Sequence, residues 1–184
     1  MGTVRRVTFD RGALEGEAPD VAPTLLNKLL VHGPCVGRIV EVEAYTADDP
    51  ASHTFGGETA RNSVMFGPPG HLYCYLSYGI HTCANIVTGP RGRGTAVLIR
   101  AVTPVAGIDE MRRRRGDAVQ LANGPGKLCQ ALGLTLAHNG VDLFDSGPVA
   151  LVDDGVPPPV VPVVGPRVGI TKGVDTPWRF RVPQ

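Results

Sequence analysis

The chain has 184 residues, of which 42% are hydrophobic and 19% charged, and it carries a net charge of +1. This length predicts one domain around a single buried core and is too short for two domains that each bury a core of their own. No apolar run approaches the roughly 20 residues that span a bilayer, and the N-terminus lacks the apolar block of a signal peptide, so we expect a cytoplasmic protein with no membrane partner.

The first quarter of the chain predicts a loose start, a helix and a strand. We expect residues 1–22 to be a loose, acidic segment. Residues 23–33, PTLLNKLLVHG, place leucines 25, 26, 29 and 30 on one face of a short amphipathic helix. Residues 35–45, CVGRIVEVEAY, alternate as a strand. One face of that strand would carry Val40, Val42 and Ala44, and the other Ile39, Glu41, Glu43 and Tyr45.

Residues 72–86, LYCYLSYGIHTCANI, predict a hairpin whose tight turn falls at Tyr78-Gly79. Such a turn needs positive φ angles, which glycine adopts freely and tyrosine rarely does. A large ring at a hairpin tip finds little of its own chain to cover it. The sequence therefore raises the question of what Tyr78 contacts.

The remaining predicted elements are short. Residues 94–102, GTAVLIRAV, form an apolar strand that contains one charge, Arg100. Helices are predicted within residues 103–116 and from residue 124, with Gly133 as the stop of the second. The proline-rich tail from Val152 should run as edge or extended chain, and residues 178–182, WRFRV, as a closing strand.

The basic residues gather in the middle of the chain. The net charge is −4 over residues 1–60, +6 over 61–130 and −1 over 131–184. This asymmetry points modestly to a polyanionic partner, although an ordinary solvated surface is the commoner reason. The run from Arg112 to Arg115 also has a structural explanation, because the C-terminal end of a helix favours cations.

Glu43 is a candidate general base. It shares its strand face with Tyr45, and His53 follows in a loop long enough to fold back on both. A partly buried carboxylate beside such groups can take a proton from water. A glutamate on the solvent face of a strand is nevertheless the commoner arrangement.

A metal site built from His71, Cys74, His81 and Cys83 is a weaker alternative, because no pair has the spacing of a zinc knuckle or ribbon. The four scattered cysteines contain no C-x-x-C pair, which favours reduced thiols. Lys127 lies near a helix start, where an anion is favoured, and Asn85 is an amide within an apolar strand, where it could read the edge of a ligand.

Several ordered blocks together resemble the alkylpurine (3-methyladenine) DNA glycosylase family. They are GRIVEVEAY, DPASH, RNSVMFGPPGHLYCYLSYGIHTCANIV, AVLIRAV, GPGKLCQALGL, PRVGI and PWRF, and they cover the chain from about residue 24 to its end. The resemblance is to a compact, bacterial-type member. It implies a single α+β domain with a curved antiparallel sheet, a protruding hairpin and flanking short helices.

The resemblance also implies an activity. Members flip alkylated or deaminated purines out of duplex DNA and hydrolyse the N-glycosidic bond, which leaves an abasic site. The implied substrates are 3-methyladenine and 7-methylguanine, together with hypoxanthine and ethenoadenine, which are neutral and would need a general acid that the sequence does not reveal. We expect a monofunctional, monomeric enzyme of the bacterial cytosol without metal or cofactor, acting on double-stranded DNA. The alternative is an inactive damaged-DNA binding protein, against which the intact Glu43 argues.

Site residues follow from the same resemblance. The catalytic group would be Glu43 as base, Arg100 beside its water and the Ile170 carbonyl. The flipped purine would bind to Tyr45, His53, Tyr75 and Asn85, and Asn85 would obstruct the exocyclic amine of guanine. The hairpin tip would intercalate through Tyr78 and Ile80, and the DNA backbone would contact Thr59, His81 and Lys127. The chain departs from the family pattern at Glu58, Ile80 and Thr103.

Overall fold

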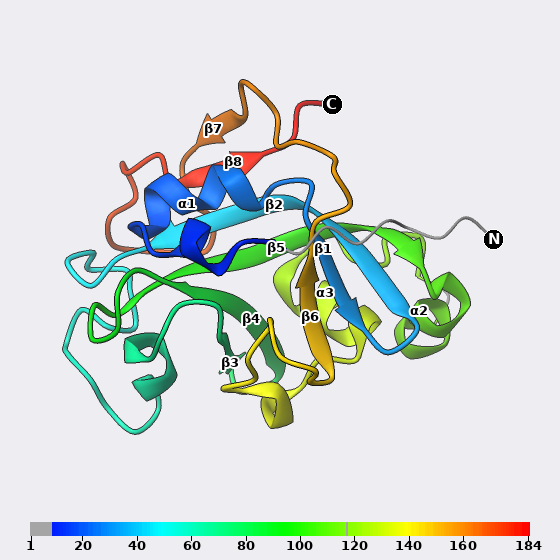
Figure 1. Ribbon diagram of the computed structural model, residues 1–184, viewed down its shortest axis with the longest axis horizontal. Coiled ribbons are helices and arrows are strands. Elements are labelled where there is room, and N and C mark those ends of the chain that lie inside the picture. Colours follow the sequence, from blue (N-terminus) through cyan, green and yellow to red (C-terminus); the bar gives the residue numbers. More distant parts are fainter. Residues whose placement is uncertain (1–8, 117) are drawn as a thin grey trace.

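The computed structural model describes residues 9–116 and 118–184, in which eight strands form one curved antiparallel sheet (Figure 1). The strand order is β3-β4-β5-β2-β1-β6, and β8 joins β2 and β7. The strands are β1 (Leu29–His32), β2 (Cys35–Tyr45), β3 (Leu72–Ser77), β4 (His81–Thr88), β5 (Thr95–Ala106), β6 (Val149–Val152), β7 (Val163–Gly165) and β8 (Arg179–Arg181). The α+β fold with its curved antiparallel sheet, predicted from the resemblance, is confirmed.

Three short helices flank the sheet. They are α1 (Ala18–Leu25), which lies over β2 in Figure 1, and α2 (Ile108–Arg115) and α3 (Pro125–Leu132), which pack together at the other end of the molecule. Gly133 ends α3 with a φ of 76°, as predicted for a left-handed helix stop. Single 3₁₀ turns cover Arg11–Leu14, Ser63–Phe66 and Leu136–His138.

The N-terminal predictions were wrong in two respects. The helix occupies Ala18–Leu25, and the later leucines belong to β1, which pairs with β2 and β6. A continuous apolar run suits a buried strand as well as a helix, and here strand pairing decides. The expected loose segment fails for residues 9–22, because Leu14, Ala18 and Ala22 are fully buried in the core. Residues 1–8 lie outside the described part of the chain.

The faces of β2 also differ from the predicted alternation. Ile39 lies in the core together with Val42 and Ala44, whereas Val40 is only partly buried. The pairing of β2 with β5 changes register on either side of Glu41, which leaves one extra residue in each strand, Val40 and Arg100. A bulge of this kind turns side chains to the other face. The prediction that Val40 shares a face with Val42 was therefore wrong.

Strands β4 and β5 are buried on both faces. On one face Ile86, Val97 and Ile99 belong to the main core beneath α1 and α3. On the opposite face Val87 and Ala96 form a smaller cluster. This explains why the sequence of β5 is almost continuously apolar. The second face is the one that carries the site.

The hairpin of β3 and β4 is present as predicted, with a turn one residue longer. Ser77 pairs with His81, which leaves Tyr78, Gly79 and Ile80 as the loop. Tyr78 and Gly79 have φ angles of 52° and 70°. Both values are those of a primed hairpin turn. The predicted extended tail and closing strand are also present, because β7 and β8 are three residues each and β8 pairs with β2.

Candidate active site

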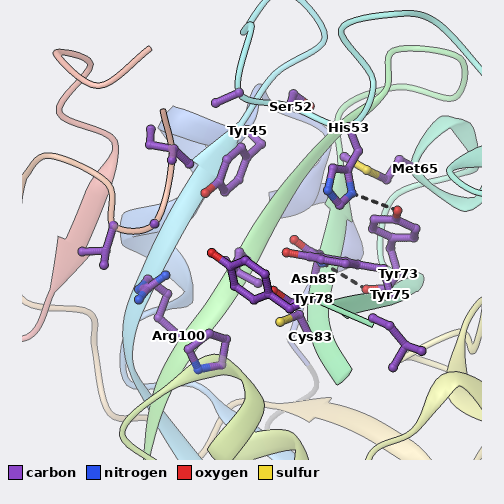
Figure 2. A pocket seen from close by; sticks show the side chains of 18 of the residues that line it. Tyr45, Ser52, His53, Met65, Tyr73, Tyr75, Tyr78, Cys83, Asn85 and Arg100 are labelled. Atoms are coloured by element: carbon purple, nitrogen blue, oxygen red, sulfur yellow. Dashed lines mark hydrogen bonds between the residues drawn. The ribbon is translucent and has the colours of Figure 1, made fainter. Parts of the chain in front are cut away.

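A cavity of about 620 Å³ opens on the second face of the sheet (Figure 2). The register of four strands fixes one row of this site, because Tyr73 pairs with Asn85, Asn85 with Leu98, and Leu98 with Glu43. Two loops complete the walls, residues 50–53 after β2 and residues 168–172 before β8. Segments distant in the sequence therefore meet in one pocket.

Aromatic rings form the walls. The rings of Tyr73 and Tyr75 stack with centroids 5.7 Å apart, and His53 meets Tyr75 edge-on at 4.4 Å. The His53 Nδ1 atom lies 3.1 Å from the Tyr73 hydroxyl. Figure 2 shows Tyr45 across the cavity from this group. The prediction that Tyr45, His53 and Tyr75 surround one space agrees with this geometry.

Burial sets the protonation states of these walls. It raises the pKa of Tyr45 and of Tyr75, so both are neutral phenols at physiological pH. The pKa of His53 is lowered, first by burial and second by the nearby Arg61 guanidinium. The pocket therefore presents uncharged aromatic surfaces at neutral pH.

Glu43 is fully buried, one layer beneath the cavity wall. The Tyr45 hydroxyl donates to its Oε2 at 2.9 Å, Arg100 Nη1 donates to the same oxygen at 3.2 Å, and the Val168 amide donates to Oε1 at 2.7 Å. All three donors belong to residues that line the cavity. All three partners are donors, as the acceptor oxygens of an ionised carboxylate require. The commoner arrangement, a solvated surface glutamate, does not apply.

Arg100 lies two residues after Leu98 on β5, and both side chains line the cavity. Arg100 Nε donates to Glu41 Oε1 at 3.2 Å while its Nη1 serves Glu43. Glu41 also lies 3.5 Å from Arg179 Nη1. The single charge in an otherwise apolar strand is thus paired with two carboxylates.

Asn85 lines the cavity. It is buried, and its Nδ2 donates to the Tyr73 carbonyl at 3.2 Å. Among the described residues, no hydrogen bond reaches its Oδ1. The amide therefore has an acceptor left for a ligand in the cavity.

A buried arginine that the sequence analysis missed supports this wall. Arg167 pairs with Asp49 through both of its Nη atoms and donates to the carbonyl oxygens of Ala44 at 3.0 Å and Gly173 at 3.2 Å. Its guanidinium lies 4.7 Å from the centre of the Tyr45 ring. The next residue after Arg167 supplies the amide to Glu43. The only sequence signal was an arginine within PRVGI and an aspartate before PASH.

The remaining predicted residues lie around the cavity. Ile170 lines it, and Tyr78 stands at its edge with 87% of its surface exposed. Ile80, Thr59, His81 and Lys127 are exposed and do not line it. Two cations at the mouth were not predicted, Arg61 and Lys172.

The hairpin thiols and imidazoles do not converge. In residues 9–116 and 118–184, no group of three or more His, Cys, Asp or Glu side chains is placed to hold a metal ion. Burial raises the pKa of Cys74 to about 12, and all four cysteines are free and buried. None of the helices in the described ranges is long and apolar enough to span a membrane.

The arginine run of α2 is engaged in local contacts. Arg112 pairs with Asp109, and Arg113 and Arg114 with Glu110. Arg115 donates to the Leu121 carbonyl at 3.0 Å. These contacts agree with the structural explanation of the run.

An aromatic pocket above a buried carboxylate, with an exposed tyrosine at its edge, defines a candidate enzyme site for a flat ring. The sequence matches the methylpurine-DNA glycosylase (MPG) family over residues 13–184. This match covers most of the chain, so the protein belongs to the methylpurine-DNA glycosylase family, a class of DNA repair enzymes.

Relatives whose sequences are about half identical to this chain agree with this assignment. A protein of Burkholderia lata named "Putative 3-methyladenine DNA glycosylase" is 52% identical in an alignment that covers 97% of this chain and 86% of that protein. Proteins with the same name are 53% identical in Rhodopseudomonas palustris, over 88% of this chain and 78% of theirs, and 52% identical in Methanoculleus marisnigri, over 95% and 94%.

Proposed function

We propose that this DNA glycosylase excises 3-methyladenine and 7-methylguanine from duplex DNA by base flipping and hydrolysis, as a monomer of the bacterial cytosol. The observation that carries the proposal is the buried Glu43 carboxylate, held by three donors beneath an aromatic cavity. The volume of that cavity lies in the usual range for small-molecule sites.

Selection of damaged bases follows from the walls. An alkylated purine that carries a positive charge stacks favourably on Tyr45 and Tyr75, because cations are attracted to the faces of aromatic rings. A protonated His53 would repel such a base, and the lowered pKa of His53 keeps its ring neutral at pH 7. Asn85 would disfavour guanine through its exocyclic amine, and 7-methylguanine, which carries the same amine, would overcome this through the attraction of its positive charge to the aromatic walls.

Hydrolysis would proceed through one water molecule. Glu43 takes a proton from the water. At the same time the water oxygen bonds to C1′, and the bond between C1′ and the purine nitrogen breaks. A cationic purine leaves as a neutral base and needs no proton, whereas hypoxanthine and ethenoadenine do. The same carboxylate stabilises the oxocarbenium-like transition state, and the Ile170 carbonyl would help to hold the water. Excision of the neutral bases is accordingly proposed as slower.

Base flipping would use the hairpin tip. The Tyr78 ring is exposed and held in a left-handed conformation that disfavours tyrosine by about 1–2 kcal/mol. Stacking on the neighbouring bases would recover roughly 1–3 kcal/mol. Ile80 beside it would act as an apolar wedge, and Thr59, His81 and Lys127 would contact phosphates. Stacking on bound DNA would thus offset the cost of the left-handed backbone at Tyr78.

The test is release of free base from methylated duplex DNA, resolved by chromatography, with strand breaks measured in parallel. We expect 3-methyladenine and 7-methylguanine to be released and the strand to remain intact until alkali is added. A protein that binds the damaged duplex without releasing base would instead be a damaged-DNA binding protein. Nicking without alkali would contradict water as the nucleophile.

A further inference from the structure

Glu41 is an acidic residue near the pocket to which the proposed reaction gives no role. It lies two residues before Glu43 on β2, and its side chain is 21% exposed. Its Oε1 accepts from Arg100 Nε at 3.2 Å and lies 3.5 Å from Arg179 Nη1. A row of alternating charges therefore runs from Arg179 through Glu41 and Arg100 to Glu43.

Arg100 lies between the two glutamates. Glu41 pairs with Ala101 and Val42 pairs with Ile99, so Arg100 is the extra residue of β5. Its side chain, 14% exposed, meets both carboxylates on the same side of β2.

The carboxylates of Glu41 and Glu43 bind different nitrogen atoms of the Arg100 guanidinium. Glu41 binds the Nε edge, and Glu43 receives one bond from Nη1 to its Oε2. An arginine beside a single carboxylate tends to form two parallel bonds, which occupy both oxygens. Here Oε1 of Glu43 keeps the Val168 amide as its partner, and Arg100 bonds only Oε2.

We infer that Glu41 is a positioning residue for catalysis: it holds Arg100 by its Nε edge so that Arg100 bonds only Oε2 of Glu43 and does not close on Oε1, the oxygen that would take the proton of the attacking water. This inference rests on the proposed function. Without Glu41, Arg100 turns toward Glu43, closes on both of its oxygens and competes with the water. Misplacement of a reacting group by about 1 Å can slow a reaction by roughly 100-fold.

The experiment compares E41A and E41Q with wild type in single-turnover excision of 7-methylguanine, with protein in excess over DNA. E41A should lower the excision rate constant by about 10- to 100-fold, because a misplaced group lies beside the reacting water. DNA affinity should stay the same or rise, since a negative charge is lost. E41Q keeps an acceptor for Arg100 Nε and should recover part of the rate. D109A is the matched control, because it removes one acid from the exposed start of α2.

A double-mutant cycle separates a positioning role from an independent one. If Glu41 acts through Arg100, E41A should have little further effect in an R100Q background. An equal effect in both backgrounds would contradict the inference, as would an E41A rate within twofold of wild type. A loss confined to DNA affinity would make Glu41 a DNA contact instead.

The environment of Arg100 can be followed independently of activity. The nitrogen-15 resonance of Arg100 Nε, assigned by its loss in R100Q, should move in E41A and remain near its wild-type position in E41Q and D109A. An inactive wild-type protein would refute the proposed function, and the resonance would still test the contact. An active wild type with an unmoved resonance in E41A would refute the inference alone.

Discussion

The buried pair of Arg167 and Asp49 gives a sharp prediction about stability. In R167M the Asp49 carboxylate remains buried without its partner, and the carbonyls of Ala44 and Gly173 lose a donor. Breaking a buried ion pair from one side destabilises a protein by about 3–5 kcal/mol. One kcal/mol lowers the Tm of a domain of this size by about 2–4 °C, so R167M should melt about 6–20 °C below wild type.

Thermal unfolding followed by circular dichroism measures this shift. The control is R93M, which breaks the exposed pairs of Arg93 with Glu17 and Asp48 and should change Tm far less. Adding D49N to R167M removes the orphaned charge and should restore part of the loss. Two results would contradict this reasoning. One is an R167M protein that melts no lower than R93M, and the other is a D49N substitution that lowers the Tm of R167M as much as it lowers the Tm of wild type.

Three further predictions concern the pocket and its mouth. Y78G should raise Tm slightly, because glycine adopts the φ of 52° freely, yet it should weaken base flipping measured by 2-aminopurine fluorescence; a fall in Tm would mean that the ring packs on the protein. Since the folded-state pKa of His53 is lowered, the unfolded chain binds the proton more readily, so stability should fall with pH as it drops below about 6.5. Excision of 7-methylguanine should weaken over the same range, and H53Q should lose both dependences; a wild type and H53Q with parallel pH profiles would contradict this. K172A should retain the single-turnover excision rate, and borohydride should trap no covalent DNA adduct with wild type; a trapped adduct lost in K172A would show that Lys172 attacks the sugar.

Periodicity predicted the parts of the site that lie on regular strands. Tyr73 and Tyr75 alternate along β3, and Asn85 follows at a fixed distance across the turn, so strand geometry alone brings them to one face. Glu43 and Tyr45 were placed together for the same reason, and the structure joins them by a hydrogen bond of 2.9 Å. The positive φ angles of Tyr78 and Gly79 also followed from local turn chemistry.

The parts that could not be predicted depend on contacts distant in the sequence. Asp49 and Arg167 are 118 residues apart, and no local pattern indicates that they pair. The bulge that leaves Val40 and Arg100 without partners comes from a change of register between β2 and β5, which alternation cannot reveal. The leucines of β1 read equally well as a helix, and only their pairing with β2 and β6 decides.

The most direct test of the account is the single-turnover excision of 7-methylguanine by E43Q. Glutamine keeps the size of the side chain but cannot take the proton of the attacking water. We predict a rate constant lower by at least about 100-fold, in the range that general bases supply, with DNA affinity close to wild type. The Tm should fall, because the amide cannot accept from all three donors and Arg100 loses a buried partner, so the rate is measured well below the Tm of the variant. An E43Q rate constant within tenfold of wild type would contradict the claim that the buried Glu43 carboxylate activates the water.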